Sequence, residues 1–156
     1  MRARYPGANR LVCRILARCI ASLIAVCLVA VSTRAIAADD LPKAHIVSLG
    51  LWGLQNLFRT EANQAAAVLQ AFYGRGGQVV VKANTPTTAV VTSAALQAEL
   101  RSVGAQMNRE QDILVLVLTS HGSPEGIGIR TGRHGEMLTP SQLRQYLQET
   151  GAVDSA

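Results

Sequence analysis

The chain has 156 residues and a formal net charge of +5, with 15 Lys and Arg residues against 10 Asp and Glu residues. Six of the basic residues, and none of the acidic ones, lie in residues 1–37. From Ala38 onward nine basic residues therefore face all ten acidic ones, and the net charge is −1. No basic stripe remains there to neutralise phosphates, so we expect no nucleic-acid partner.

The first 37 residues have the pattern of a secretory signal peptide. Five arginines precede the 13-residue segment Cys19–Val31, which is apolar except for Ser22, and the sequence Ala-Ile-Ala follows at 35–37. This order of a basic region, a short apolar region and an A-x-A site is typical of an export signal. A membrane-spanning helix needs about 20 apolar residues. We therefore predict cleavage near Ala37, no stable membrane anchor, and a periplasmic or extracellular location.

Removing this segment also removes all three cysteines, Cys13, Cys19 and Cys27. Residues 38–156 then contain no disulfide, no thiolate metal site and no thiol nucleophile. Their 119 residues are enough for one domain with its own core.

The first half of this predicted domain, 38–156, alternates strands and helices. Strands are expected at 44–51 and 78–83, separated by a loop at 52–57 and a helix at about 58–73. The apolar face of that helix is predicted to comprise Ala62, Ala65, Ala66, Leu69 and Phe72, and its end to be set by Gly74, Gly76 and Gly77.

A second helix and a third strand continue the pattern. Thr92 or Ser93 caps the helix, one face of which carries Leu96, Leu100, Val103 and Met107. The third strand, 112–119, is almost wholly apolar. Continuous apolar strands that alternate with helices predict an α/β fold, with a parallel sheet flanked by helices on both faces.

The pattern changes after residue 121. Residues 126–129 and 136–138 flank a glycine-rich turn and predict a hairpin. Thr139, Pro140 and Gln142 then form a capping box at the start of a last helix. Its apolar face is predicted to hold Leu143, Tyr146 and Leu147, and Gly151 to end it.

His121 stands just beyond the third strand, and the carboxyl ends of parallel strands are where α/β proteins build their sites. Ser120 cannot be its nucleophile, because neighbouring side chains of an extended strand point to opposite faces. His121, His134 and Glu136 do not match a compact metal-ligand spacing. From its position alone His121 can be either a catalytic base or an ordinary surface or capping residue. We expect neither a metal nor another cofactor.

Three stretches, NLFRTEANQAAAVLQAFYGRGG, DILVLVLTSHGSPEGI and LTPSQLRQYLQETG, together resemble the first half of a legumain-family cysteine peptidase. The resemblance covers about residues 44–151 and implies the caspase-like three-layer sandwich and a peptide or protein substrate. It places His121 on the family's catalytic histidine and Gly122 on the glycine whose N–H helps to form the oxyanion hole. Arg59 resembles the arginine of the primary specificity pocket. Thr60 departs from the histidine often found next in eukaryotic members.

In that family the nucleophilic cysteine ends the fourth strand, beside the histidine strand. A short loop and a strand of about 5 to 6 residues after Gly151 put this position beyond Ala156. We therefore expect an incomplete copy that lacks the nucleophile and is inactive as it stands. The alternative is a non-catalytic exported α/β binding domain. The family's strand order also predicts that residues 113–118 form an open edge through which the chain self-associates.

Overall fold

The computed structural model describes residues 41–74 and 76–151. The predicted signal peptide at 1–37 lies outside these described residues. Among the helices in the described part of the chain, none is long and apolar enough to cross a membrane.

A parallel three-stranded sheet forms the centre of the described domain. Its strands are β1 (Ala44–Gly50), β2 (Val79–Ala83) and β3 (Ile113–Thr119), in the order β2-β1-β3. β1 pairs in parallel with both neighbours, Ile46 lying opposite Val79 on one side and Val115 on the other. The α/β class and the parallel sheet are confirmed, and each strand lies within one residue of its predicted bounds.

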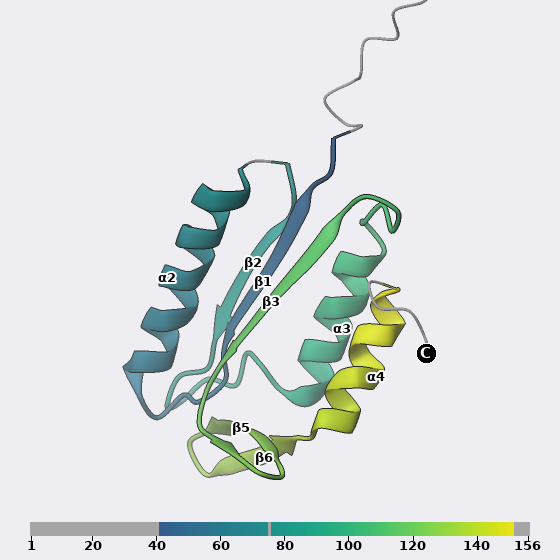
Figure 1. Cartoon of the computed structure of the whole chain (residues 1–156). Coiled ribbons are helices and arrows are strands. Elements are labelled where there is room, and N and C mark those ends of the chain that lie inside the picture. The colour runs from purple at the N-terminus through teal and green to yellow at the C-terminus, as the bar shows by residue number, and fades with distance from the viewer. Residues whose placement is uncertain (1–40, 75, 152–156) are drawn as a thin grey trace, which may run out of the picture. The chain divides into compact units, whose positions relative to one another are not determined.

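Helices cover both faces of this sheet (Figure 1). α2 (Asn56–Tyr73) lies on one face, whereas α3 (Ser93–Gly104) and α4 (Pro140–Thr150) lie side by side on the other. The larger core lies between the sheet and α3 with α4, and its buried residues are Val47, Leu49, Leu51, Val80, Val91, Leu96, Leu100, Val103, Ile129, Leu138 and Tyr146.

The predicted start of α3 and both predicted ends of α4 are confirmed. Met107, predicted on the face of α3, lies beyond the end of that helix at Gly104. The side chain of Thr92 accepts from the N–H of Ala95 at the start of α3, 3.1 Å away. Thr139 and Gln142 form both bonds of the capping box that begins α4. Gly151 ends α4 in the left-handed conformation, with φ of 69°, which a glycine adopts at little cost.

The predicted buried face of α2 is wrong at Phe72, whose side chain is 79% exposed. α2 packs against the sheet through Phe58, Ala62 and Ala66, which are four residues apart. Phe72 lies about 80° around the helix from the centre of this stripe, so its side chain faces solvent, whereas Leu69 lies near the centre and is half-buried. The helix also begins at Asn56, two residues before its predicted start.

A second, antiparallel sheet lies at the carboxyl end of the parallel one (Figure 1). The predicted hairpin is confirmed as β5 (Gly126–Thr131) and β6 (His134–Leu138), and the unpredicted strand β4 (Gly122–Ser123) pairs with β5. Two backbone bonds fix the hairpin to the end of β1. Gly53 N–H donates to the carbonyl of Arg130 at 2.7 Å, and Arg130 N–H donates to that of Leu51 at 2.9 Å.

Candidate functional site

The chain brings His121 to the junction of the two sheets. β3 ends at Thr119, and the His121 carbonyl accepts a hydrogen bond from the N–H of Gly128 in β5 at 2.9 Å. The hydroxyl of Ser120 donates to the carbonyl of the same Gly128. One backbone bond and one side-chain bond to Gly128 of β5 therefore hold this turn against the hairpin.

Two aromatic rings hold the imidazole of His121 by edge-to-face contacts. The ring centroids of Trp52 and His121 are 4.8 Å apart at an interplanar angle of 89°, and those of Phe58 and His121 are 4.9 Å apart at 76°. Trp52 follows β1 and Phe58 lies in the first turn of α2, so three segments of the chain meet here. His121 is nevertheless exposed, and none of the described residues hydrogen-bonds its ring nitrogens. Those nitrogens are therefore accessible to a proton donor.

Arg130 completes this group of side chains. Its guanidinium carbon lies 5.5 Å from the centre of the Trp52 ring, in cation–π geometry. The indole packs over Gly128, where a Cβ atom would come within 2.9 Å of the ring atom Cζ3 of Trp52. Trp52, Phe58 and Arg130 were not expected from the sequence. The one local signal was a glycine inside a strand, which often marks a close approach of another group.

Gly122 directs its N–H away from the hairpin. Gly122 pairs with Ile127, and paired residues in an antiparallel ladder alternate between bonded and non-bonded pairs. Because His121 and Gly128 form a bonded pair, the N–H of Gly122 points away from β5. A Cβ atom at Gly122 would meet only the carbonyl oxygen of Gly126, at 3.8 Å. The backbone of Gly122 is therefore approachable from outside.

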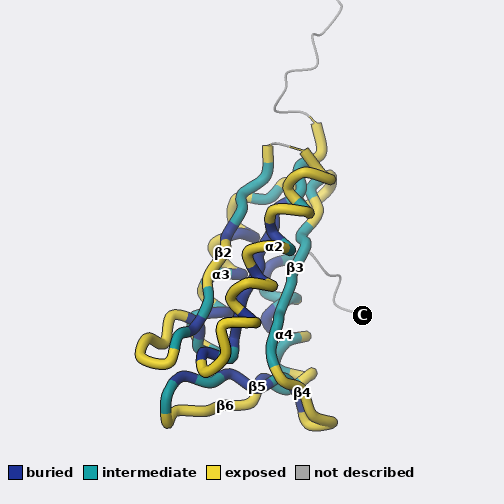
Figure 2. The backbone as a smooth tube through the Cα atoms, turned by 90° about the vertical axis from the view of Figure 1, so that its left-hand side faces the viewer, coloured by how far each residue is buried: buried dark blue, intermediate teal, exposed yellow. Residues whose placement is uncertain are grey.

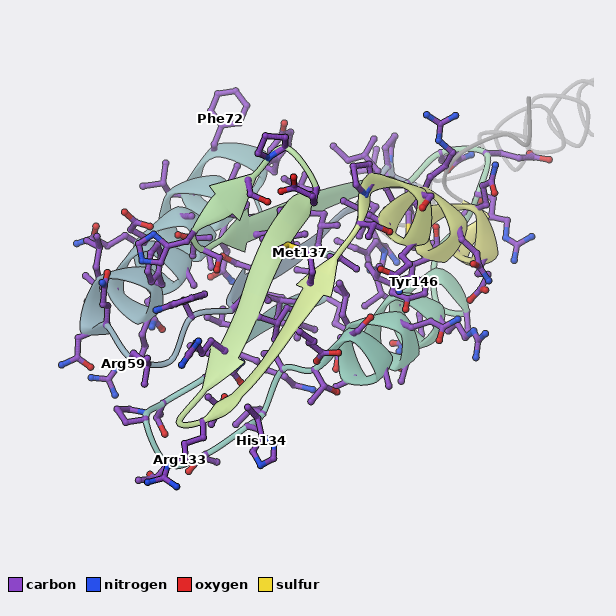
Figure 3. All side chains as sticks on the ribbon, turned by 90° about the horizontal axis from the view of Figure 1, so that it is seen from below. Arg59, Phe72, Arg133, His134, Met137 and Tyr146 are labelled. Atoms are coloured by element: carbon purple, nitrogen blue, oxygen red, sulfur yellow. The ribbon has the colours of Figure 1, made fainter. Side chains whose placement is uncertain are left out.

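Arg59 lies apart from these contacts. It is exposed in the first turn of α2, next to Phe58, and its side chain projects outward in Figure 3. Its carbonyl accepts from the side-chain amide of Asn63 at 2.7 Å. The structure thus brings His121 and Gly122 together but places the Arg59 side chain on the outer side of α2.

The other two histidines lie elsewhere in the fold. His45 begins β1 at the opposite end of the sheet, where its Nε2 lies 3.2 Å from Asp112. His134 is exposed at the tip of the hairpin (Figure 3), whereas the carboxylate of Glu136 accepts from the N–H of Ser93. Within the described residues, no group of three or more His, Cys, Asp or Glu side chains is placed to hold a metal ion.

Asp112 is the buried carboxylate at that opposite end. Its side chain is 5% exposed and accepts hydrogen bonds from the N–H groups of Lys43 and Asn108, both at 2.8 Å. Burial raises the pKa of Asp112. The hydrogen bonds from Asn108, Lys43 and His45 lower the pKa by more than burial raises it, so the pKa is below its ordinary value. This pair ties the amino ends of β1 and β3 together.

A cavity of about 330 Å³ lies on the other face of the hairpin from the indole. Val91, Ile129, Thr131 and Glu136 are among its lining residues, and His121 is not.

No protein-family model, curated protein or solved structure matches the chain. The geometry around His121 is therefore the main guide to function.

Proposed function

We propose that this chain carries the histidine-bearing half of a legumain-type cysteine peptidase site within a caspase-like fold. His121 is the general base, the N–H of Gly122 is an oxyanion donor, and the substrate is a peptide or protein. One observation carries the proposal: an accessible imidazole stands at the carboxyl end of β3, directly before a glycine whose N–H points away from its own ladder.

The two groups match the needs of peptide hydrolysis by a thiol. The imidazole takes the proton of the thiol, and the thiolate attacks the peptide carbonyl to form a C–S bond. The N–H of Gly122 stabilises the negative charge that develops on the carbonyl oxygen. The protonated imidazole then gives its proton to the leaving amine as the C–N bond breaks. Water, deprotonated by the same imidazole, hydrolyses the thioester and restores the thiol.

The thiol must come from outside residues 38–156, which contain no cysteine. In the described sheet β3 is an edge strand. Ile113 N–H donates to Lys43 and the Thr119 carbonyl accepts from Leu51, so the even-numbered residues Leu114, Leu116 and Leu118 direct their N–H and C=O groups to the open edge. A strand paired here in parallel ends beside His121, and we propose that such a strand supplies the thiol.

The site is proposed to work outside the cytoplasm, with residues 1–37 as the export signal. The expected mature chain begins at Ala38. Intact-mass measurement on secreted material checks this, and a secreted product that retains Met1 contradicts it.

The test uses the chain together with the coding sequence that follows residue 156 at its native locus. Hydrolysis of peptide amides should be abolished by iodoacetamide, and His121→Ala should lower kcat/KM by about 10² to 10⁴-fold because the general base is lost. His134→Ala, at the exposed hairpin tip, is the control and should leave the rate unchanged. The absence of hydrolysis, or hydrolysis that survives either His121→Ala or the thiol reagent, contradicts the proposal.

A further inference from the structure

The outer face of the β5–β6 hairpin presents one fixed cation. The register places Arg130 opposite Gly135 and Gly128 opposite Met137, so two of the four side-chain positions on this face are glycines. The indole of Trp52 occupies the space above Gly128, and a Cβ atom at Gly135 would lie 3.9 Å from Nη1 of Arg130. Figure 3 shows Met137 on the same hairpin, with Arg133 and His134 at its tip.

The guanidinium of Arg130 has no carboxylate partner among the described residues. By contrast, Arg101 pairs with Glu149 at 2.8 Å. The Nε–H of Arg130 is buried and donates to no acceptor within the described part of the chain. A ligand does not reach this buried edge, so a carboxylate would bind the guanidinium through its two Nη groups, because the planar fork of arginine matches a carboxylate in two parallel hydrogen bonds.

Arg130 also lies within reach of a ligand at His121. Both groups contact the same indole, His121 at 4.8 Å and Arg130 at 5.5 Å from its centroid. The imidazole and the guanidinium carbon are therefore no more than about 10 Å apart, which is roughly three residues of an extended peptide. One ligand segment can contact both.

We propose that Arg130, held by Trp52, binds a carboxylate side chain of the peptide ligand and makes the site selective for acidic peptides. This inference rests on the proposed function in that the ligand is a peptide. The selecting carboxylate belongs to the residue whose carbonyl lies at His121 or to one of its near neighbours. Arg130, rather than Arg59, is then the residue that determines the preference for acidic peptides.

Binding without turnover tests this inference separately from catalysis. Trp52 is the only tryptophan of the sequence, so its fluorescence reports on this site alone. The purified chain is titrated with N-acetyl-aspartate methylamide and with its neutral isostere, N-acetyl-asparagine methylamide. The midpoint of each titration is confirmed by calorimetry, because substitutions next to the indole also alter the signal amplitude.

The aspartate probe should bind more tightly than the asparagine probe. Arg130→Gln should weaken aspartate binding by about 10- to 100-fold, the usual effect of losing a charged hydrogen bond. Arg130→Lys, which keeps the charge but not the planar fork, should give an intermediate loss. The matched control Arg133→Gln should change nothing. Thermal melting identifies any variant that fails to fold. If Arg130→Gln does not fold, the affinity of Arg130→Lys for the aspartate probe tests the inference instead.

Equal affinity for the two probes overturns the inference, as does a loss that follows Arg59→Gln and not Arg130→Gln. If the aspartate probe binds through Arg130 but the locus product hydrolyses no peptide, the carboxylate site stands and the peptidase proposal fails. If peptides are hydrolysed through His121 without regard to acidic residues, the peptidase proposal stands and this inference fails.

Discussion

Gly128 is the residue that lets the indole of Trp52 lie against His121. A Cβ atom there would come within 2.9 Å of the ring, closer than real Cβ contacts allow, so the indole or the strand has to move. Gly128→Ala should lower the free energy of unfolding by about 1 to 3 kcal/mol, the usual cost of overpacking. It should also shift the emission of Trp52.

The matched control for this prediction is Gly135→Ala on the same face of the hairpin. Its Cβ atom would meet nothing closer than 3.9 Å, so the free energy of unfolding should change by no more than about 0.5 kcal/mol. Urea denaturation followed by fluorescence measures both variants. Equal effects of the two substitutions would show that the indole does not pack on Gly128.

Sequence reasoning placed His121 just beyond the end of β3 but did not predict its neighbours, for a physical reason. An apolar strand that runs into a polar turn is a local pattern, and it located the strand end correctly. Trp52 and Arg130 come from segments that meet only when the hairpin bonds to the end of β1. Such a contact between distant segments leaves no periodic pattern in the sequence. The position of Trp52 in a predicted loop therefore did not indicate that it would contact His121.

At the scale of elements, β3 and β2 form edges of different character. β3 contains no charged residue from Ile113 to Thr119, whereas β2 carries Lys82, and charges on an edge strand oppose pairing with another chain. β3 is also half-buried along most of its length (Figure 2). We therefore expect the chain to self-associate through β3 rather than through β2.

Sedimentation of the purified chain measures this association. Ile113→Lys, at a 45% exposed position of β3, should shift the population toward monomer because it places a charge on the pairing edge. Val81→Lys, at a 37% exposed position of β2, is the control and should have no effect. In the monomer the outward amides of Leu114, Leu116 and Leu118 should exchange with solvent faster than their neighbours. A monomeric wild-type chain with all β3 amides equally protected contradicts the prediction.

The starts of α3 and α4 were predicted correctly because each depends on a few neighbouring residues. The buried face of α2 was predicted less well because it depends on residues spread along the whole helix. The capping side chains of Thr92 and Thr139 act within three residues of themselves, so their sequence pattern was sufficient. The face of α2 depends on its rotation relative to the sheet over many residues, and Phe72 lay too far from the packed Ala62 and Ala66 to share their face. The two-residue β4 depends on pairing with β5 and has no pattern of its own.

At the scale of the whole domain, stability should depend on pH through Asp112. Its pKa is lowered in the folded state, so it contributes stability above the unfolded value of about 3.9 and loses that contribution as pH falls through the lower folded value. Asp112→Asn should cost about 1 to 3 kcal/mol at neutral pH, because two backbone donors lose a charged acceptor.

Urea denaturation between about pH 7 and pH 3 measures this effect. The wild-type chain should lose more stability on acidification than Asp112→Asn, since the variant has no carboxylate to protonate at this position. Glu110→Gln, at a nearby exposed position, is the control and should follow the wild-type curve. Parallel curves for wild type and Asp112→Asn would show that protonation of Asp112 does not cause the loss of stability at low pH.

The central claim is that His121 works as a pair with a thiol carried on a strand beside β3. The most direct measurement is the rate at which iodoacetamide alkylates that thiol in the product of the native locus, at about pH 6. Pairing with imidazole stabilises the thiolate, so His121→Ala should slow alkylation by about 10-fold or more, whereas His134→Ala should not. Equal rates in the wild type and in His121→Ala, or a locus product without a cysteine beyond residue 156, would contradict the account.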